Sequence, residues 1–367
     1  MNKKITVLHT ESSKGWGGQE IRILQEAIGM RERGYRVLIA TEKDGNLYQR
    51  ALKEGLEVFP INFSKYNPLS FLRIKSLIEK ERVDIVNTHS SKDSWIATIA
   101  AKMAFNKPKI IRTRHLSTPI SKSYLSKIIY DIIPDLIITT GEAIRENMIK
   151  IHKFNPKKIV SIPTGVDLNK FNPDSVKPMI DKDRILIGSI GILRSWKGHE
   201  YLLKAIPLVI KKIKKVHFYI VGDGPQFNNL KKLIEELKIE NYVSMLGYVE
   251  DTAAILKSLD ILIHPSTSNE GVPQVVLQAL SMRVPVIACN VGSIGEIIKD
   301  KKTGILIEPK NSYAIYEAIL EILKDNELKS KIIENGFKLV EEHYSFNKML
   351  NKIENLYIGL LKNDINK

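Results

Sequence analysis

The sequence His264-Pro265-Ser266-Thr267-Ser268-Asn269-Glu270-Gly271-Val272-Pro273-Gln274-Val275-Val276-Leu277-Gln278 joins a predicted strand to a predicted helix. The preceding run Asp260-Ile261-Leu262-Ile263 is typical of a buried parallel strand, and residues 275–280 are typical of a helix packed on a sheet. Pro273 suits the first helical position, where its missing N–H would have no partner. Glu270 is therefore expected in a strand-to-helix loop at the carboxyl edge of a sheet, where open α/β sheets bind ligands.

The same loop has the features of an anion site. Gly271 allows a ligand to approach the backbone closely. The free N–H groups and the dipole of the following helix favour an anion, above all a phosphate. A strand–loop–helix unit that only happens to carry a glutamate has the same periodicity, so both interpretations stay open from periodicity alone.

Length and composition indicate a two-domain globular protein. The chain has 367 residues, with 43% apolar and 26% charged residues. Its one cysteine, Cys289, lies in an apolar run and is expected to be a buried strand residue. The first apolar run, Ile5 to Leu8, is too short for a signal peptide and predicts a first strand. No run approaches the length of a membrane span, so the expected compartment is the cytoplasm.

The formal charge of +15 is unevenly distributed along the chain. Residues 1–170 contain 29 Lys and Arg against 17 Asp and Glu, and the remainder contains 27 against 24. Solvated surface is one explanation of the excess, and the candidate partners are anionic lipid, an anionic acceptor or nucleic acid.

The segment 122–133 lies in the most basic part of the chain. It carries apolar residues at helical spacing and two lysines, namely Leu125, Ile128, Ile129, Ile132, Ile133, Lys122 and Lys127. This pattern fits an ordinary core-facing helix, and a membrane-surface helix is the alternative.

The first half of the chain alternates strands and helices. The strand Ile5–Leu8 is followed by the loop Gly15-Trp16-Gly17-Gly18-Gln19-Glu20, a helix over 21–33 and a strand over 37–40. This loop is not a G-x-G-x-x-G fingerprint, so it predicts either a tight turn or a backbone cradle for phosphate or acceptor. His89 and His115 fall at the carboxyl ends of two later strands, and a structural role is the simpler interpretation of His89.

Residues 171–183 lack periodicity and are interpreted as a linker between domains. They include Asp181-Lys182-Asp183, which precedes a strand and is therefore assigned to the linker and not to metal binding. Alternation restarts at Ile185, and the tail from Met349 to Leu361 predicts an amphipathic helix. Two consecutive α/β halves imply two Rossmann-like domains.

Glu270-Gly271-Val272-Pro273, with a polar residue eight positions after the glutamate, resembles the E-x7-E signature of retaining glycosyltransferases of family 4 (glycosyl transferases group 1). The G-G-x-E loop of that family resembles Gly17 to Glu20, and its basic loop resembles Lys197-Gly198. Two positions depart from the family pattern. The second glutamate is Gln278 here, and Ile192 stands where an arginine is usual, with Arg194 two residues later.

The resemblance covers nearly the whole chain and implies the GT-B fold, an α/β architecture of two doubly wound Rossmann-like domains facing a cleft. Residues 1–170 would form the acceptor-binding domain, joined by the C-terminal helix 346–367 crossing back to it. Residues 171–183 would be the linker, and residues 184–345 the domain that binds the nucleotide sugar.

The resemblance also implies roles for individual residues. Glu270 and His115 would be catalytic, and Gln278 would take the place of the ribose-binding glutamate. The groups that would bind the donor diphosphate and sugar are Gly17, Gly18, Arg194, Lys197, Gly271, Val272, Pro273 and Gln274. No metal cluster is expected, so side chains and a helix dipole would stabilise the leaving phosphate.

The expected function is retaining, metal-independent transfer of a sugar from a nucleotide-diphosphate sugar to a saccharide or lipid-linked acceptor. Lipopolysaccharide or another bacterial cell-surface polysaccharide is the expected product, without a cofactor and with peripheral contact to the inner face of the cytoplasmic membrane as a hypothesis. A GT-B epimerase and a non-catalytic nucleotide-sugar sensor are the alternatives. A nucleic-acid-binding protein and an NAD oxidoreductase are disfavoured, because their signature motifs are missing from the sequence.

Overall fold

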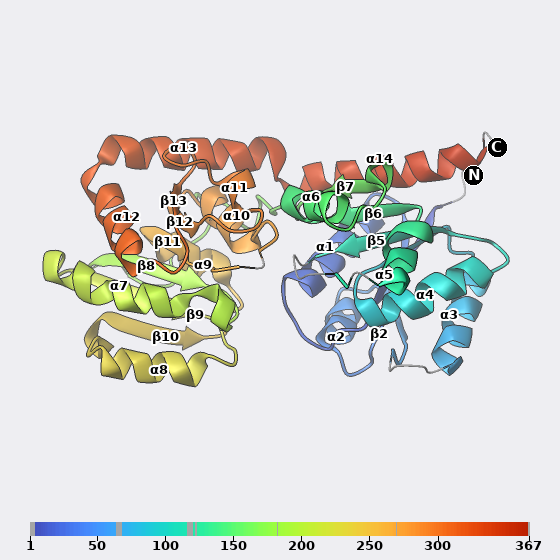
Figure 1. The fold of residues 1–367 in the computed structure, drawn as a ribbon, viewed down its shortest axis with the longest axis horizontal. Coiled ribbons are helices and arrows are strands. Elements are labelled where there is room, and N and C mark those ends of the chain that lie inside the picture. The colour runs from blue at the N-terminus through green and yellow to red at the C-terminus, as the bar shows by residue number, and fades with distance from the viewer. Residues whose placement is uncertain are drawn as a thin grey trace. The chain divides into compact units, whose positions relative to one another are not determined.

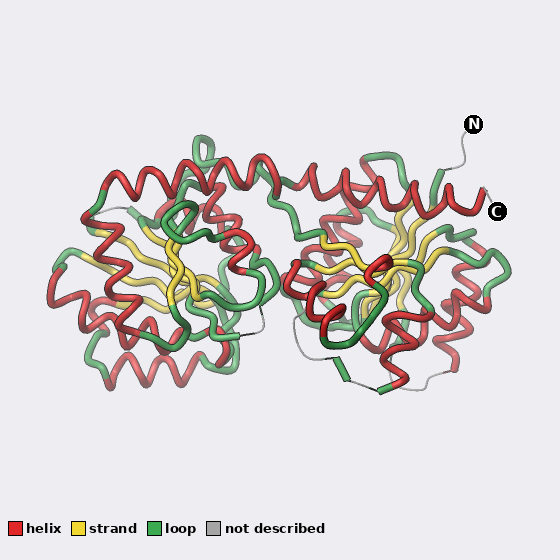
Figure 2. Tube along the Cα trace, turned by 45° about the horizontal axis from the view of Figure 1, so that its top comes forward, coloured by secondary structure: helices red, strands yellow, loops and turns green. Residues whose placement is uncertain are grey.

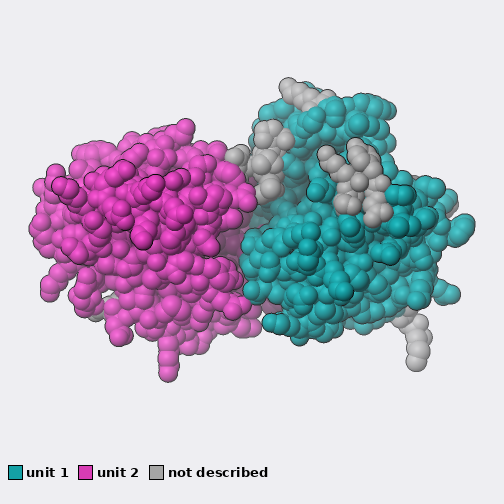
Figure 3. All heavy atoms as spheres, turned by 90° about the horizontal axis from the view of Figure 1, so that it is seen from below, with its two compact units in different colours: residues 1–163, 349–367 teal, residues 164–348 magenta. Residues whose placement is uncertain are grey.

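The computed structural model describes residues 4–63, 68–115, 120–121, 123–181, 183–268 and 270–365. Contacts divide the chain into two compact units (Figure 3). Unit 1 comprises Met1–Pro163 and Met349–Lys367, and unit 2 comprises Thr164–Lys348.

Unit 1 is built on a sheet with helices around it (Figure 1). The strands are parallel, in the order β3-β2-β1-β4-β5-β6-β7. Its strands are β1 (Thr6–Glu11), β2 (Arg36–Thr41), β3 (Glu57–Pro60), β4 (Ile85–Thr88), β5 (Lys109–Arg114), β6 (Leu136–Thr139) and β7 (Ile159–Ser161). Its helices are α1 (Gly18–Glu32), α2 (Asn46–Lys53), α3 (Pro68–Lys80), α4 (Ser91–Met103), α5 (Tyr124–Lys127), the π-helix η1 (Ile128–Ile132), α6 (Glu142–Lys150) and the 3₁₀ turn η2 (Pro156–Lys158).

Unit 2 repeats this plan with strand order β10-β9-β8-β11-β12-β13, again parallel. Its strands are β8 (Ile185–Ile190), β9 (Val216–Val221), β10 (Val243–Gly247), β11 (Ile261–His264), β12 (Val286–Cys289) and β13 (Ile305–Ile307). Its helices are the 3₁₀ turns η3 (Ser195–Lys197) and η4 (Glu240–Tyr242) with α7 (His199–Lys212), α8 (Phe227–Glu236), α9 (Thr252–Ser258), α10 (Gln274–Ser281), α11 (Ile294–Ile297), α12 (Ser312–Lys324) and α13 (Asn326–His343).

Helices flank the strands of each unit (Figure 2), and both faces of the unit 2 sheet are buried. Alternate residues of a strand point to opposite faces. In β11, Ile261 and Ile263 join one apolar cluster while Leu262 joins the other. Cys289 is buried at the end of β12, as expected for an apolar strand residue. Burial on both faces explains why these strands are continuous apolar runs rather than alternating ones.

The strand orders fix where each sheet can hold a ligand. In each sheet the order reverses beside the first strand, between β1 and β4 in unit 1 and between β8 and β11 in unit 2. Such reversals open a crevice at the carboxyl ends of the two neighbouring strands. His9 lies on β1 and His89 follows β4, while Lys197 follows β8 and Glu270 follows β11.

The C-terminal helix α14 (Phe346–Ile365) belongs to unit 1 from Met349 onward, so the chain returns to this unit as the resemblance implied. Tyr357 is fully buried, and Glu354 pairs with Arg33 at 2.7 Å. No helix that the structure describes has the length and apolar content needed to cross a membrane.

Two segments differ from the simplest expectation. Residues 171–183 pack on unit 2 where described: Phe171 is in its core, and the Met179 amide donates to the Ala254 carbonyl oxygen at 3.1 Å. In the segment 122–133 the helix begins at Tyr124 and continues as a π-helix; Ile129 is buried, whereas Leu125 is 59% exposed. Lys122 and Lys182 lie outside the described residues.

Candidate active site

Glu270 is the centre of a buried polar cluster after β11. Its Oε1 atom accepts a hydrogen bond from Lys197 Nζ at 2.6 Å and another from Ser266 Oγ at 2.6 Å. His264 Nε2 lies 3.4 Å from the same oxygen, and the Glu270 residue is only 6% exposed. The loops after β8 and β11, which are neighbouring strands, therefore meet at one carboxylate oxygen.

The electrostatics of this cluster keep Glu270 ionised. Burial opposes the charged carboxylate, but the ammonium of Lys197 and the contact with His264 outweigh it and hold the pKa of Glu270 below its usual range. Burial lowers the pKa of His264, so this ring is neutral at pH 7. The cluster then contains one cation and one anion, with a neutral ring beside them.

Two glycines allow the loops to approach this closely. Gly198 has a φ of 68°, and a Cβ atom there would lie 2.1 Å from the Pro265 carbonyl oxygen. Gly292, in the loop after β12, has a φ of 57°, and a Cβ atom there would lie 2.0 Å from the carbonyl oxygen of Glu270. Only glycine adopts this conformation readily and leaves the space free. The Thr267 amide also donates to the Trp196 carbonyl at 2.7 Å, which ties the two loops together.

The remaining predicted donor-site residues of unit 2 lie on the same two loops and on α10. Arg194 is exposed, with its guanidinium 5.0 Å from the centre of the Trp196 ring, whereas Lys197 contacts Glu270 directly. Gly271 and Val272 lead into α10, which begins at Gln274. Pro273 is the residue before that helix and not its first residue, a shift of one position from the sequence prediction.

Gln278 lies on α10, four residues after Gln274, and is half-buried. Its backbone carbonyl accepts from the Met282 amide at 3.0 Å and from Ser281 Oγ at 2.8 Å. The helix therefore fixes its backbone, and the ribose contact that the resemblance implies for its side chain stays a prediction.

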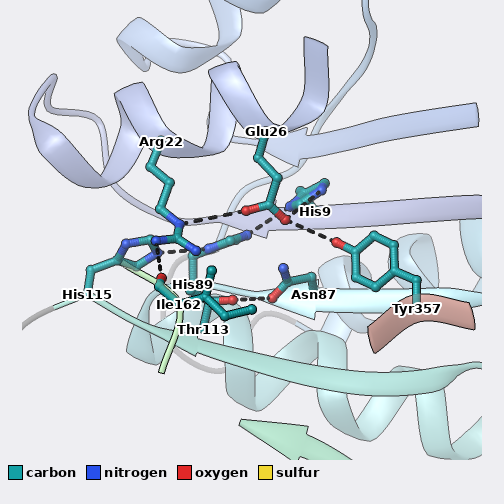
Figure 4. Close-up of polar contacts among 9 residues, drawn as sticks. All are labelled: His9, Arg22, Glu26, Asn87, His89, Thr113, His115, Ile162 and Tyr357. Carbon is teal, nitrogen blue, oxygen red and sulfur yellow. Dashed lines mark hydrogen bonds and ion pairs between the residues drawn. The ribbon is translucent and has the colours of Figure 1, made fainter. Parts of the chain in front are cut away.

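In unit 1 the structure joins His115 to the two other histidines at the carboxyl edge of the sheet (Figure 4). His115 directly follows β5, and its Nε2 lies 2.9 Å from His89 Nδ1. His89 Nε2 in turn lies 2.9 Å from His9 Nδ1. Burial is the main cause that lowers the pKa of each of the three rings. The structural role of His89 is thus a hydrogen bond to a predicted catalytic residue.

The glycine-rich loop lies at the same edge of the sheet. Gly17 caps α1, and its amide donates to Glu20 Oε2 at 2.9 Å. Apart from its chain neighbours and its own helix backbone, no heavy atom of the described residues lies within 4 Å of a Cβ placed on Gly18, so this Cβ would enter open space. Glu11, at the end of β1, accepts from the Ser13 amide at 2.7 Å and from the side chains of Gln19 and Ser90. The loop is therefore anchored by a buried carboxyl.

Sequence reasoning overlooked His264, Ser266 and His9. Each is a polar residue within or just after a buried apolar strand, and that position was the available signal. Lone histidines and serines are common in such places, so only the convergence of His264 and Ser266 on Glu270 distinguishes them. Among the described residues, no group of three or more His, Cys, Asp or Glu is arranged to hold a metal ion.

Two family models match consecutive parts of the chain. The family model "Glycosyltransferase Family 4" matches residues 16–170, and "Glycosyl transferases group 1" matches residues 171–339. The chain is 30% identical over 320 residues to the Escherichia coli UDP-Gal:alpha-D-GlcNAc-diphosphoundecaprenol alpha-1,3-galactosyltransferase, covering 80% of each chain.

Solved structures give the same result for the fold. A glycosyltransferase from Rickettsia africae superposes with a TM-score of 0.87 at 26% identity, covering 98% of this chain and 99% of the other. Anabaena HepE in complex with UDP and glucose superposes with a TM-score of 0.84 at 19% identity, covering 97% of this chain and all of the other.

Proposed function

Because this chain belongs to family 4 of the glycosyltransferases and has the GT-B fold, we propose that it transfers a sugar from a UDP-sugar to a lipid-linked saccharide. The ion pair between Lys197 and Glu270, at the carboxyl edge of the unit 2 sheet, is the observation that carries the proposal. The E. coli relative, whose name specifies UDP-galactose and a diphosphoundecaprenol acceptor, supports the classes of donor and acceptor.

Lys197 and Glu270 carry charges of the signs that the reaction needs. Breaking the bond between sugar and diphosphate develops positive charge on the sugar and negative charge on the leaving phosphate. An ammonium has three N–H donors, so Lys197 can hold Glu270 and still donate to a phosphate oxygen. Arg194 and the amino end of α10 would add to the binding of the diphosphate. Glu270, kept ionised, would contact sugar hydroxyls and stabilise the positive charge.

Transfer would proceed with retention of configuration. The acceptor hydroxyl would attack the face of the sugar from which the diphosphate leaves. Its proton would pass to the leaving phosphate, so the bond to the acceptor forms as the bond to the diphosphate breaks. The anomeric configuration of the product, measured by NMR, tests this step, and an inverted product would contradict it.

We also infer that transfer is metal-independent, because Lys197, Arg194 and the helix dipole are assigned to the charge of the diphosphate. Activity should persist in excess EDTA. Loss of activity in EDTA that Mg²⁺ or Mn²⁺ restores would refute the assignment.

Unit 1 would dock on an anionic membrane surface to reach a lipid-linked acceptor. The excess of basic residues supports this, since residues 101–170 contain 13 Lys and Arg against 5 Asp and Glu. Tyr124, Leu125 and Ile132 expose half or more of their surface and could enter the interface. Basic residues near such a surface contribute about 1 kcal/mol each, and salt screens them. Co-sedimentation with anionic and neutral liposomes, using Lys127→Glu as the variant, tests this docking; equal binding to both liposomes would refute it.

The experiment for the whole proposal is a thermal-shift screen with UDP, GDP and ADP, followed by product analysis. We expect UDP to stabilise the protein most and a UDP-sugar to yield a glycosylated polyprenyl-diphosphate saccharide. A product that contains an isomerised nucleotide sugar and needs no acceptor would favour an epimerase instead.

A further inference from the structure

Three histidines in unit 1 form a continuous hydrogen-bonded chain that ends near a buried carboxylate (Figure 4). His115 contacts His89 and His89 contacts His9, each pair with nitrogens 2.9 Å apart. The outer nitrogen of the last ring, His9 Nε2, lies 4.0 Å from Glu26 Oε1. One end of this histidine chain is His115, a predicted catalytic residue. The other end is His9, which lies beside Glu26, an acidic residue of α1.

Glu26 belongs to a buried ion pair. Its Oε2 lies 3.7 Å from Arg22 Nε, one helical turn away, and both side chains are excluded from solvent. Arg22 also donates to the Ile162 carbonyl oxygen at 2.7 Å, and the Tyr357 hydroxyl donates to Glu26 Oε1 at 3.0 Å. Buried charges persist when they are paired and hydrogen-bonded. The carboxylate therefore presents negative charge to His9.

A neutral imidazole has one N–H and one bare nitrogen, so the protons of the three hydrogen-bonded rings can be arranged in two ways. With a proton on His9 Nε2, that N–H faces the carboxylate, and His9 Nδ1 accepts from His89. His89 Nδ1 then accepts from His115 Nε2. The reverse order would place the lone pair of His9 Nε2 opposite the negative charge of Glu26, which is unfavourable.

Burial supports the neutral state of the rings that this argument needs. It is the largest cause that lowers the pKa of His9, His89 and His115, and the charge of Arg22 lowers the pKa of each of them further. With all three rings neutral, the two arrangements of their protons are the states to compare. They differ in the direction of every hydrogen bond between the rings.

We propose that Glu26, acting through His9 and His89, fixes His115 with its proton on Nε2 and a bare Nδ1 that accepts a hydrogen bond from a hydroxyl of the bound sugar. Glu26, His9 and His89 are then positioning residues for His115. The identity of the ligand rests on the proposed function, whereas the protonation of the ring does not.

The tautomer can be observed directly. In protein labelled with ¹⁵N-histidine, long-range ¹H–¹⁵N spectra distinguish the two ring nitrogens, and single-histidine variants assign the eight histidines. We expect the ligand-free protein to show His115 protonated on Nε2. A proton on Nδ1, or a mixture of the two tautomers, would overturn the proposal. The tautomer is observed in the native protein, and the variants serve only to assign its signals.

Two variants at the Glu26 end of the histidine chain separate the effect of the carboxylate charge from the effect of packing. Glu26→Gln replaces the carboxylate by an amide that can donate to His9, so the order can reverse and Nδ1 of His115 should gain proton occupancy. Tyr357→Phe removes a hydrogen bond to Glu26 but keeps its charge, so the tautomer should remain that of the native protein. An unchanged His115 spectrum in folded Glu26→Gln would contradict the role of Glu26.

Activity provides a second test. His89→Phe keeps a ring but interrupts the chain, and kcat should fall roughly tenfold, the loss of about one hydrogen bond. Binding of UDP, measured by calorimetry, should not change. His217→Phe is the matched control, because His217 is also hydrogen-bonded (2.8 Å to Ser244 Oγ) but lies on β9 in unit 2. Equal effects of the two variants would refute the positioning role. If no nucleotide sugar supports transfer in the native protein, the proposed function fails and the tautomer result still stands.

Discussion

Replacing Lys197 by methionine should destabilise unit 2 in a pH-dependent way. The substitution keeps an unbranched side chain as far as Cε and removes the ammonium 2.6 Å from Glu270 Oε1. Glu270 would remain buried with Ser266 and His264 as partners. Breaking a buried ion pair by removing one partner costs about 3–5 kcal/mol. Because the Lys197 side chain is 18% exposed and Ser266 still donates, we expect the lower end, about 3 kcal/mol at pH 7.5.

The sign of the pH dependence follows from the pKa of Glu270. In the native protein this pKa lies below its unfolded value, so the stabilisation is present above the unfolded pKa and is lost as the pH falls through the folded pKa. In Lys197→Met burial dominates and should raise the folded pKa above the unfolded one, so stability falls as the pH rises. The difference between the two proteins should therefore narrow from pH 7.5 to pH 4.5. Protonation of His264, 3.4 Å from the same oxygen, acts in the same direction.

Urea denaturation followed by tryptophan fluorescence measures this difference. The chain has three tryptophans, and replacing Trp16 and Trp95 by phenylalanine leaves Trp196 as a reporter in unit 2. Lys204→Met is the matched control, because Lys204 forms an exposed pair with Glu200 at 3.1 Å and should change stability by less than about 1 kcal/mol. Equal effects of Lys197→Met and Lys204→Met at pH 7.5, or a difference that does not narrow at pH 4.5, would refute the reasoning.

Three further predictions concern residues of the unit 2 site. Glu270→Gln should reduce kcat/KM by the equivalent of about 2–4 kcal/mol while circular dichroism shows an intact fold, because a neutral amide cannot stabilise the positive sugar; near-normal turnover would remove Glu270 from the mechanism. Gln278→Glu should leave UDP affinity unchanged or higher in calorimetry, since a carboxylate accepts more strongly from ribose hydroxyls, and a large loss would show another role for Gln278. Gly198→Ala should lower stability by more than about 1 kcal/mol, because φ is positive and the new Cβ meets the Pro265 carbonyl; Gly18→Ala, with open space at its Cβ, should change stability less.

The sequence alone determined the local elements and their class. Apolar runs such as Ile261 to Ile263 alternate along the chain with segments of helical periodicity and predict strands buried on both faces. Such a strand can be recognised from its own sequence, because it is apolar at successive positions. The polar residues at the ends of these runs, including Glu270 and His115, could therefore be assigned to the carboxyl edges of two sheets. The helix α2 was not predicted. A helix over 122–133 was predicted, but not the π-helical form of Ile128–Ile132, because the spacing of apolar residues does not distinguish a π-helix from an α-helix over one turn.

Only the tertiary structure decided which of these residues meet. Strand order places β8 beside β11, which brings Lys197 to Glu270 across 73 residues of sequence. In the same way β1 lies beside β4, so His9 reaches His89 across 80 residues, and α14 brings Tyr357 to Glu26 across 331. The spacing of apolar residues indicates which face of a helix or strand is buried, but not which other element packs against that face. The direction of the hydrogen bonds in the histidine chain, and with it the protonation of His115, depends on these packing partners.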